Sequence, residues 1–310
     1  MENLVVEKKY VVSSSPHVRS PETVQKIMID VLISLVPAVV VAAVFFREQA
    51  IIPIVICLVA AMATEFLVLR KGIFNDGSAA VTGILLALTL PPGSAWWMCV
   101  VGAVSAIILG KYVFGGLGSN IFNPALVGRA VLLASWGGRM TAWLSPVDLK
   151  SAATPLAEPG QAALVDLITG NVAGSLGETS AIALLIGAAY LLYKGHINWR
   201  IPGGYIGSAL VLGAVLTAGG LGFDINMGLF HVMAGGLLLG ALFMATDMVT
   251  SPVTPNGQLI FGIGCGVLTV LIRVLGNFPE GVTFSILIMN AVTPLIDNAT
   301  RPRFYGEVKK

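Results

Sequence analysis

Ten runs of apolar residues dominate the sequence and decide what the chain can fold into. The hydrocarbon core of a bilayer is about 30 Å thick, and a helix needs about 20 mostly apolar residues to cross it. Charged residues make up only 11% of the chain, so it cannot cover a globule with polar surface. We therefore expect an all-α polytopic membrane protein, in which several runs are too short to cross alone. The runs are 27–46, 51–69, 78–92, 96–114, 122–136, 181–193, 203–221, 228–245, 258–275 and 282–296.

The distribution of basic residues predicts the orientation of the chain, because Lys and Arg accumulate on the cytoplasmic side of membranes. If the N-terminus is inside and all ten runs cross, thirteen of the 18 basic residues are inside and Arg129 lies within a run. Both termini are then cytoplasmic, and the loop 137–180 is extracytoplasmic. The basic residues left outside are Arg47, Arg139, Lys150 and Arg273.

The loop 137–180 also divides the runs into two sets of five. An odd number of segments in each half inverts one half relative to the other in the membrane. The predicted divisions are a cytoplasmic tail (1–26), a first five-helix half (27–136), the loop (137–180), a second five-helix half (181–298) and a cytoplasmic tail (299–310).

A faint internal echo supports two related halves. GAVSAIILGK (102–111) is similar to GCGVLTVLIR (264–273), and the same offset sets Asn123 opposite Ser285. Both are residue types that cap helix N-termini, and Pro124 suits the first helical position. Both residues are therefore candidate helix caps.

Charged residues inside apolar runs are costly and often mark functional sites. Asp30 and Glu65 lie close to segment ends, where we expect solvent to reach them. Arg129 lies two turns into its helix and needs an anionic partner or a phosphate. Asp247 lies in FMATDMVTSPVTP (243–255), whose hydroxyls and prolines predict a broken helix. Such backbone is tolerated where it lines a cavity or is buried in protein, so Asp247 is either a ligand or a cap.

Cysteine and histidine are too few and too scattered to suggest a metal or haem site. No metal-ligand spacing is present, and nothing in the chain suggests a nucleic-acid partner.

The segment DLKSAATPLA (148–157) presents one hydroxyl, Thr154, in the long loop. Pro155 biases the threonine toward an extended backbone, and Ala152 and Ala153 leave its oxygen uncrowded. We expect Thr154 to be exposed. From local chemistry alone, the segment is either a small-residue linker or a strand that an enzyme can grip and modify.

Over nearly its whole length the chain resembles a family of membrane proteins. The family comprises the D component of the Rnf complex, an ion-translocating ferredoxin:NAD oxidoreductase, and the B component of the Na⁺-pumping NADH:quinone reductase. The stretches that carry the resemblance are SPHVR (15–19), GSAAVTGILLALTLPP (77–92), FGGLGSNIFNPALVGRA (114–130), NWRIP (198–202), GALFMATDMVTSPVTPNGQLIFG (240–262) and GNFPEGVTFSILIMNAVTPLID (276–297).

The resemblance implies a covalent cofactor in the long loop. In the family, the motif Asp-x-x-Ser/Thr-Gly-Ala-Thr receives FMN from a flavin transferase as a phosphoester on the threonine. Here Asp148, Ser151 and Ala153 stand at the recognition positions and Thr154 at the acceptor, while Ala152 replaces the usual glycine. The resemblance also implies a urea-transporter-like fold of two inverted halves and a second, non-covalent riboflavin.

The function implied is that of a flavoprotein electron carrier in the cell membrane of a bacterium or archaeon. It would work in a redox-driven Na⁺ or H⁺ pump with the A, B, C, E and G components of Rnf, in the lipid bilayer, and would not be catalytic alone. If ions pass through this chain, polar groups between the halves would carry them: Thr246, Asp247 and Thr250, with Arg129 as counter-charge or flavin ligand. The alternatives are a non-redox channel or transporter for a small polar solute, and a scaffold protein of the complex.

Overall fold

The computed structural model describes residues 22–70, 76–146, 148–157, 164–178, 180–216, 223–276 and 281–302. This part of the chain is helical, and its only extended pairing is an isolated bridge between Leu144 and Ser151. The all-α prediction is confirmed. The SPHVR stretch, Glu280, residues 1–21 and residues 303–310 lie outside the described residues.

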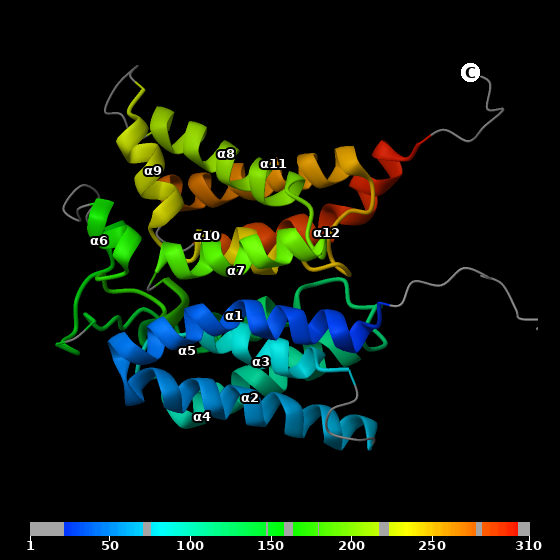
Figure 1. The fold of residues 1–310 in the computed structure, drawn as a ribbon, viewed down its shortest axis with the longest axis horizontal. Helices are drawn as coiled ribbons and strands as arrows, with labels where there is room; N and C mark the ends of the chain where they lie inside the picture. Colours follow the sequence, from blue (N-terminus) through cyan, green and yellow to red (C-terminus); the bar gives the residue numbers. More distant parts are fainter. Residues whose placement is uncertain are drawn as a thin grey trace, which may run out of the picture.

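The helices form two groups that follow the two halves of the sequence. Figure 1 shows the group α1–α5 in blue to green below the group α7–α12 in green to red. The helices of the first group are α1 (Val24–Phe46), α2 (Glu48–Leu69), α3 (Ser78–Thr89), α4 (Trp96–Ile107) with its π-helical extension η1 (Ile108–Tyr112), and α5 (Pro124–Met140).

The long loop contains three short helices, η2 (Pro155–Ala157), α6 (Leu164–Thr169) and η3 (Leu176–Glu178). The second group then follows. Its helices are α7 (Ala181–Lys194), α8 (Arg200–Leu216), α9 (Ile225–Met233), α10 (Leu237–Leu239) with its π-helical extension η4 (Gly240–Met244), α11 (Pro255–Leu275) and α12 (Val282–Thr300).

Four of the described helices, α1, α2, α11 and α12, are long and apolar enough to cross a membrane. A fifth span results if α9 and the α10–η4 segment, which are bent by 69° at a short break, are counted as one. The expectation of a polytopic membrane protein with several short apolar segments is therefore confirmed. That all ten segments cross stays a prediction.

The start of α5 confirms one predicted cap and the start of α12 corrects another. Asn123 caps α5, because its Oδ1 accepts hydrogen bonds from the backbone N–H groups of Ala125 (3.0 Å) and Leu126 (3.3 Å), and Pro124 follows at the first helical position. Ser285 lies inside α12 instead of before it, and its hydroxyl donates to the Val282 carbonyl (2.9 Å). Asn123 has a proline directly after it and Ser285 does not, so only the first sequence fixes a helix start.

Glycines let helices of each half pack closely in the same pattern. In the first half, a Cβ at Gly83 of α3 would lie 2.8 Å from the Cys57 carbonyl and 3.2 Å from Ala61, both in α2. In the second half, a Cβ at Gly228 of α9 would lie 2.5 Å from the Leu210 carbonyl and 3.1 Å from Ala214, both in α8. In each half the glycine thus meets a carbonyl and, four residues later, an alanine of the helix before it.

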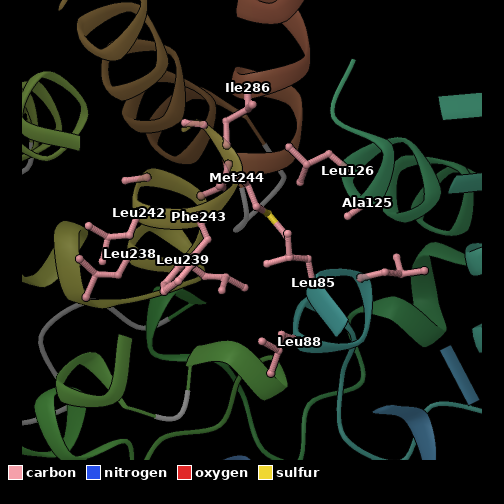
Figure 2. Packing of buried hydrophobic residues seen from close by; sticks show 14 of the residues in the cluster. Leu85, Leu88, Ala125, Leu126, Leu238, Leu239, Leu242, Phe243, Met244 and Ile286 are labelled. Carbon is pink, nitrogen blue, oxygen red and sulfur yellow. The ribbon is translucent and has the colours of Figure 1, made fainter. Parts of the chain in front are cut away.

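The two halves meet along α1 and α7, which pack side by side, and in a central apolar region. Figure 2 shows side chains of α3, α5, the α10–η4 segment and α12 converging there. These helices come from both halves, so burial of this region holds the halves together. The converging side chains include Leu85, Leu88, Ala125, Leu126, Leu238, Leu239, Leu242, Phe243, Met244 and Ile286.

The bundle has two distinct ends. The first turn of α1 and the last turn of α12 lie at one end, on the right in Figure 1, and α6 of the long loop lies at the other. This arrangement is the one expected if both termini face one side of a membrane and the long loop faces the other.

Candidate functional site

The predicted attachment motif lies on a tight hairpin of the long loop. Ser145 donates its N–H to the Lys150 carbonyl (2.8 Å), and Ala152 donates to the Trp143 carbonyl (3.2 Å). Leu149 at the turn has a left-handed φ of 54°. The three predicted recognition residues, Asp148, Ser151 and Ala153, are exposed on this hairpin. The structure therefore brings them together on an accessible surface.

Thr154 itself is buried, with 5% of its surface exposed, so the prediction of an exposed threonine is wrong for the chain alone. Two residues further on, Leu156 packs against a small cluster of Leu167, Phe230 and Ala234. The sequence held no local signal for this contact, because its partners lie in α6 and α9.

The Thr154 hydroxyl fits a covalent ester. Among the described residues, the Thr154 oxygen takes part in one hydrogen bond, which it accepts from the Leu156 N–H at 3.5 Å. A bond of that length is weak, so esterifying the oxygen would remove little that stabilises the fold. The neighbouring Ala153 is exposed.

Two arginines, the buried Arg129 and the half-buried Arg273, hold the ends of two half-length helices. Arg129 of α5 donates from Nη1 to the carbonyl of Thr89, the last residue of α3. Arg273 of α11 donates from Nη1 to the His231 carbonyl (2.5 Å) and from Nη2 to the Ala234 carbonyl (3.0 Å), at the end of α9. Helix C-termini carry partial negative charge, so each guanidinium faces a favourable site.

An inserted segment of the long loop brings a carboxylate between these arginines. Ser175 and Glu178 are buried, and the Ser175 hydroxyl donates to Glu178 Oε1 (2.7 Å). Burial raises the pKa of Glu178, while Ser175, Arg129 and Arg273 act against this. Sequence analysis missed Glu178, because nothing in the sequence of the loop distinguishes it from the other acidic residues there.

Asp247 lies in a turn between η4 and α11. It accepts hydrogen bonds from the Val249 N–H (3.4 Å) and the Thr250 hydroxyl (3.2 Å). Burial raises its pKa and these two hydrogen bonds lower it. The Thr246 hydroxyl donates to the Leu242 carbonyl (2.8 Å). The predicted break of the helix is confirmed by this turn.

A cavity of about 110 Å³ lies between the two halves at the end of the bundle opposite α6. Thr246 and Asp247 line it, and Thr250 does not. Its walls are mostly apolar, with further polar groups from Lys111, Asn120 and His196. The side-chain amide oxygen of Asn120 is buried there without a hydrogen-bond partner among the described residues.

Arg129 and Asp247 line different cavities. Arg129 lines a much smaller one of about 10 Å³ together with Thr89 and Ser175, and its guanidinium faces the end of α3. That Arg129 serves as a counter-charge in an ion path stays a prediction.

Asp30 and Glu65 are buried and bonded to polar side chains instead of solvated, so that expectation is also wrong. Asp30 accepts from the Tyr190 hydroxyl (2.7 Å) and pairs with His196 (2.8 Å), which links the two halves. Glu65 pairs with buried Lys111 of the same half. In each case the partner supplies the polar environment that was expected from solvent.

Comparison with known proteins gives a consistent family. The profile of the "NQR2, RnfD, RnfE family" matches residues 11–306. The D component of the Na⁺-translocating ferredoxin:NAD⁺ oxidoreductase complex of Acetobacterium woodii is 47% identical, over 98% of this chain and 97% of its own. The D component of the proton-translocating ferredoxin:NAD⁺ oxidoreductase complex of Clostridium ljungdahlii is 46% identical, over 96% of each chain. The D component of the ion-translocating oxidoreductase complex of Stutzerimonas stutzeri is 39% identical, over 92% of each.

Proposed function

This chain belongs to the NQR2, RnfD, RnfE family and is a subunit of an ion-translocating ferredoxin:NAD oxidoreductase complex. From this premise we propose that it is a membrane electron carrier with FMN bound covalently to Thr154. The observation that carries the proposal is the hairpin, which presents Asp148, Ser151 and Ala153 together beside an acceptor hydroxyl with one weak hydrogen bond.

In this proposal Thr154 holds the cofactor through its side-chain oxygen. A phosphorus–oxygen bond forms at Thr154 Oγ1 as the bond between the flavin phosphate and a nucleotide leaving group breaks, and the hydroxyl proton leaves to a base. The isoalloxazine supplies the redox chemistry once bound. The protein fixes its place at the α6 end of the bundle, which we assign to the extracytoplasmic side with both termini in the cytoplasm.

Ala152 stands where the family usually has glycine, and we propose that the transferase accepts it. Ala152 is half-buried, and its N–H donates to the Trp143 carbonyl within the hairpin. The methyl group therefore belongs to a regular hairpin that does not need a left-handed glycine at this position.

The remaining parts of the proposal concern the space between the halves. We place the non-covalent riboflavin near its apolar walls and the polar groups of Lys111 and Asn120; acid extraction would separate this flavin from covalent FMN. Thr246 and Asp247 in the same cavity, with Thr250 bonded to Asp247, are the proposed ion-path residues.

The matching glycine contacts of α2–α3 and α8–α9 support two inverted five-helix halves of urea-transporter type, with all ten segments in the membrane.

In-gel flavin fluorescence tests the attachment. The denatured wild-type protein, produced in cells that have the transferase, should fluoresce, and Thr154→Val should be dark while still inserting in the membrane. Thr169→Val, at an exposed threonine of α6 in the same loop, is the matched control and should fluoresce.

Two results would overturn the proposal in different ways. Fluorescence that survives in Thr154→Val would move the attachment to another residue. A dark wild-type protein would favour the second candidate, a channel or transporter that uses the same fold without redox work, or a protein that only scaffolds its partners.

A further inference from the structure

We propose that Arg273 is a positioning residue for the covalent flavin, and that its guanidinium receives the phosphodiester formed at Thr154. This inference rests on the proposed attachment and adds the group that holds the anionic end of the cofactor. It follows from the place where the Thr154 segment docks.

The docking place is the break between α9 and α10. There the chain turns through Gly235, which has a left-handed φ of 65°. Arg273 reaches the break from α11 and donates to the carbonyls of His231 and Ala234. The guanidinium is thus fixed in position by two backbone acceptors before any ligand binds, which is the preorganisation that anion binding needs.

The Thr154 segment comes to the same place. A Cβ at Gly235 would lie 2.6 Å from Leu156 Cδ1 and 2.8 Å from Arg273 Nη2, so both side chains lie against the same face of Gly235. The Thr154 hydroxyl accepts from the N–H of Leu156. The Thr154 oxygen is therefore within one short turn of Leu156, and Leu156 and Arg273 lie against the same face of Gly235.

The charges at the break favour an anion. The two carbonyls that Arg273 contacts are neutral, and its Nε is buried without a hydrogen-bond partner among the described residues. Glu178 is the carboxylate that attracts Arg273, but it also attracts Arg129, so its single charge is divided between two guanidinium groups. A phosphodiester brings one further negative charge and accepts several hydrogen bonds. Arginine is the side chain best suited to such a group.

Two other cations of the loop end are less well placed. Lys150 is exposed on the hairpin, where water competes for it. Arg139 is exposed and lies over the ring of Trp97, 5.5 Å from its centroid, on the first half. Neither is held by backbone acceptors at the point where Leu156 docks.

The test is a cycle of variants in the assembled, flavinylated complex. Trypsin cleavage after Lys150 reports how firmly the loop is docked, and the flavin fluorescence identifies the fragment. We expect attached flavin to slow cleavage on the order of ten-fold relative to Thr154→Val, the factor that a charge-assisted hydrogen bond provides. Arg273→Gln should abolish this flavin-dependent protection, and Arg273→Lys should keep most of it. Arg139→Gln is the control and should behave as wild type.

The cycle separates a charge partner from a merely structural arginine, because a structural role would alter cleavage equally with and without flavin. Equal flavin-dependent protection in wild type and Arg273→Gln would overturn the inference. An electron cryomicroscopy map of the wild-type complex provides a measurement free of variants, and it should place phosphate oxygens against the Arg273 guanidinium. A phosphate on Lys150 or Arg139 instead would overturn the inference. A wild-type protein without flavin fluorescence would overturn the proposed attachment and this inference together. A fluorescent wild-type protein whose flavin-dependent protection survives in Arg273→Gln would overturn only the inference.

Discussion

Substitution of Gly187 by alanine probes the contact that joins the two halves. Gly187 lies in α7, and a Cβ there would overlap the Ser34 carbonyl oxygen of α1 and approach Phe243 Cζ to 3.0 Å. The carbonyl belongs to a hydrogen-bonded helix and cannot rotate away as a side-chain end can. The two helices would have to separate along the interface where Asp30 meets Tyr190 and His196.

The expected effect follows from two opposing contributions. Overpacking in a close-packed interface costs about 1–3 kcal/mol, and the backbone clash places Gly187→Ala at the upper end. Replacing glycine by alanine inside a helix stabilises it by about 1 kcal/mol. The net effect is a loss of about 2 kcal/mol. Gly207→Ala in α8 is the matched control, because nothing lies within 4 Å of a Cβ there and only the favourable contribution remains.

Thermal unfolding in detergent, followed by tryptophan fluorescence, measures the two variants against the wild-type chain. Gly187→Ala should lower the midpoint, and Gly207→Ala should leave it unchanged or raise it. A midpoint for Gly187→Ala at or above wild type would refute the close α1–α7 approach. Equal losses in both variants would show that helix backbone effects, and not the inter-half contact, determine the result.

Two further substitutions test other buried contacts by the same assay. Lys111→Met leaves the buried Glu65 carboxylate without its ion partner and should lower the free energy of unfolding by about 3 kcal/mol. Lys26→Met removes an exposed ion pair with Glu22 and should have little effect. Equal unfolding midpoints for the two variants would contradict the buried pair. Asn123→Ala removes the α5 cap and a hydrogen bond to a carbonyl of η4, and should cost about 1–2 kcal/mol. Asn226→Ala, at an exposed position of α9, is the control. If Asn123 caps α5, Asn123→Ala should lose more stability than Asn226→Ala.

The helices of this chain follow from local sequence. The apolar runs predicted the place of each long helix, because burial in a bilayer or a bundle needs only continuous apolar residues. Asn123 followed by Pro124 predicted the start of α5, because the cap bonds are made within three residues. Ser285 shows the limit of that argument, since a residue type without the following proline did not mark a helix end.

The polar partners could not be predicted, because they are distant in sequence. Asp30 meets Tyr190 and His196, which lie 160 and 166 residues away, and Glu65 meets Lys111, 46 residues away. The docking of Leu156 could not be predicted for the same reason, since it packs on a cluster from α6 and α9. The family resemblance identified the motif residues, whereas neither the hairpin nor the surface against which Leu156 packs was indicated by the sequence.

The two arginines at the helix ends also bear on where ions can move. Carbonyls at the ends of half-length helices bind cations in many transporters. Here the carbonyls of Thr89 and of His231 and Ala234 are held by tethered guanidinium groups, which a mobile cation would have to displace against their charge. The loop end of the inter-half space is therefore unfavourable for cations. At the other end, Asp247 lines a cavity and has hydrogen bonds but no cation partner among the described residues. In the proposed ion path, Asp247 would therefore be at the favourable end, and the arginine-held end would have to rearrange before the path could open.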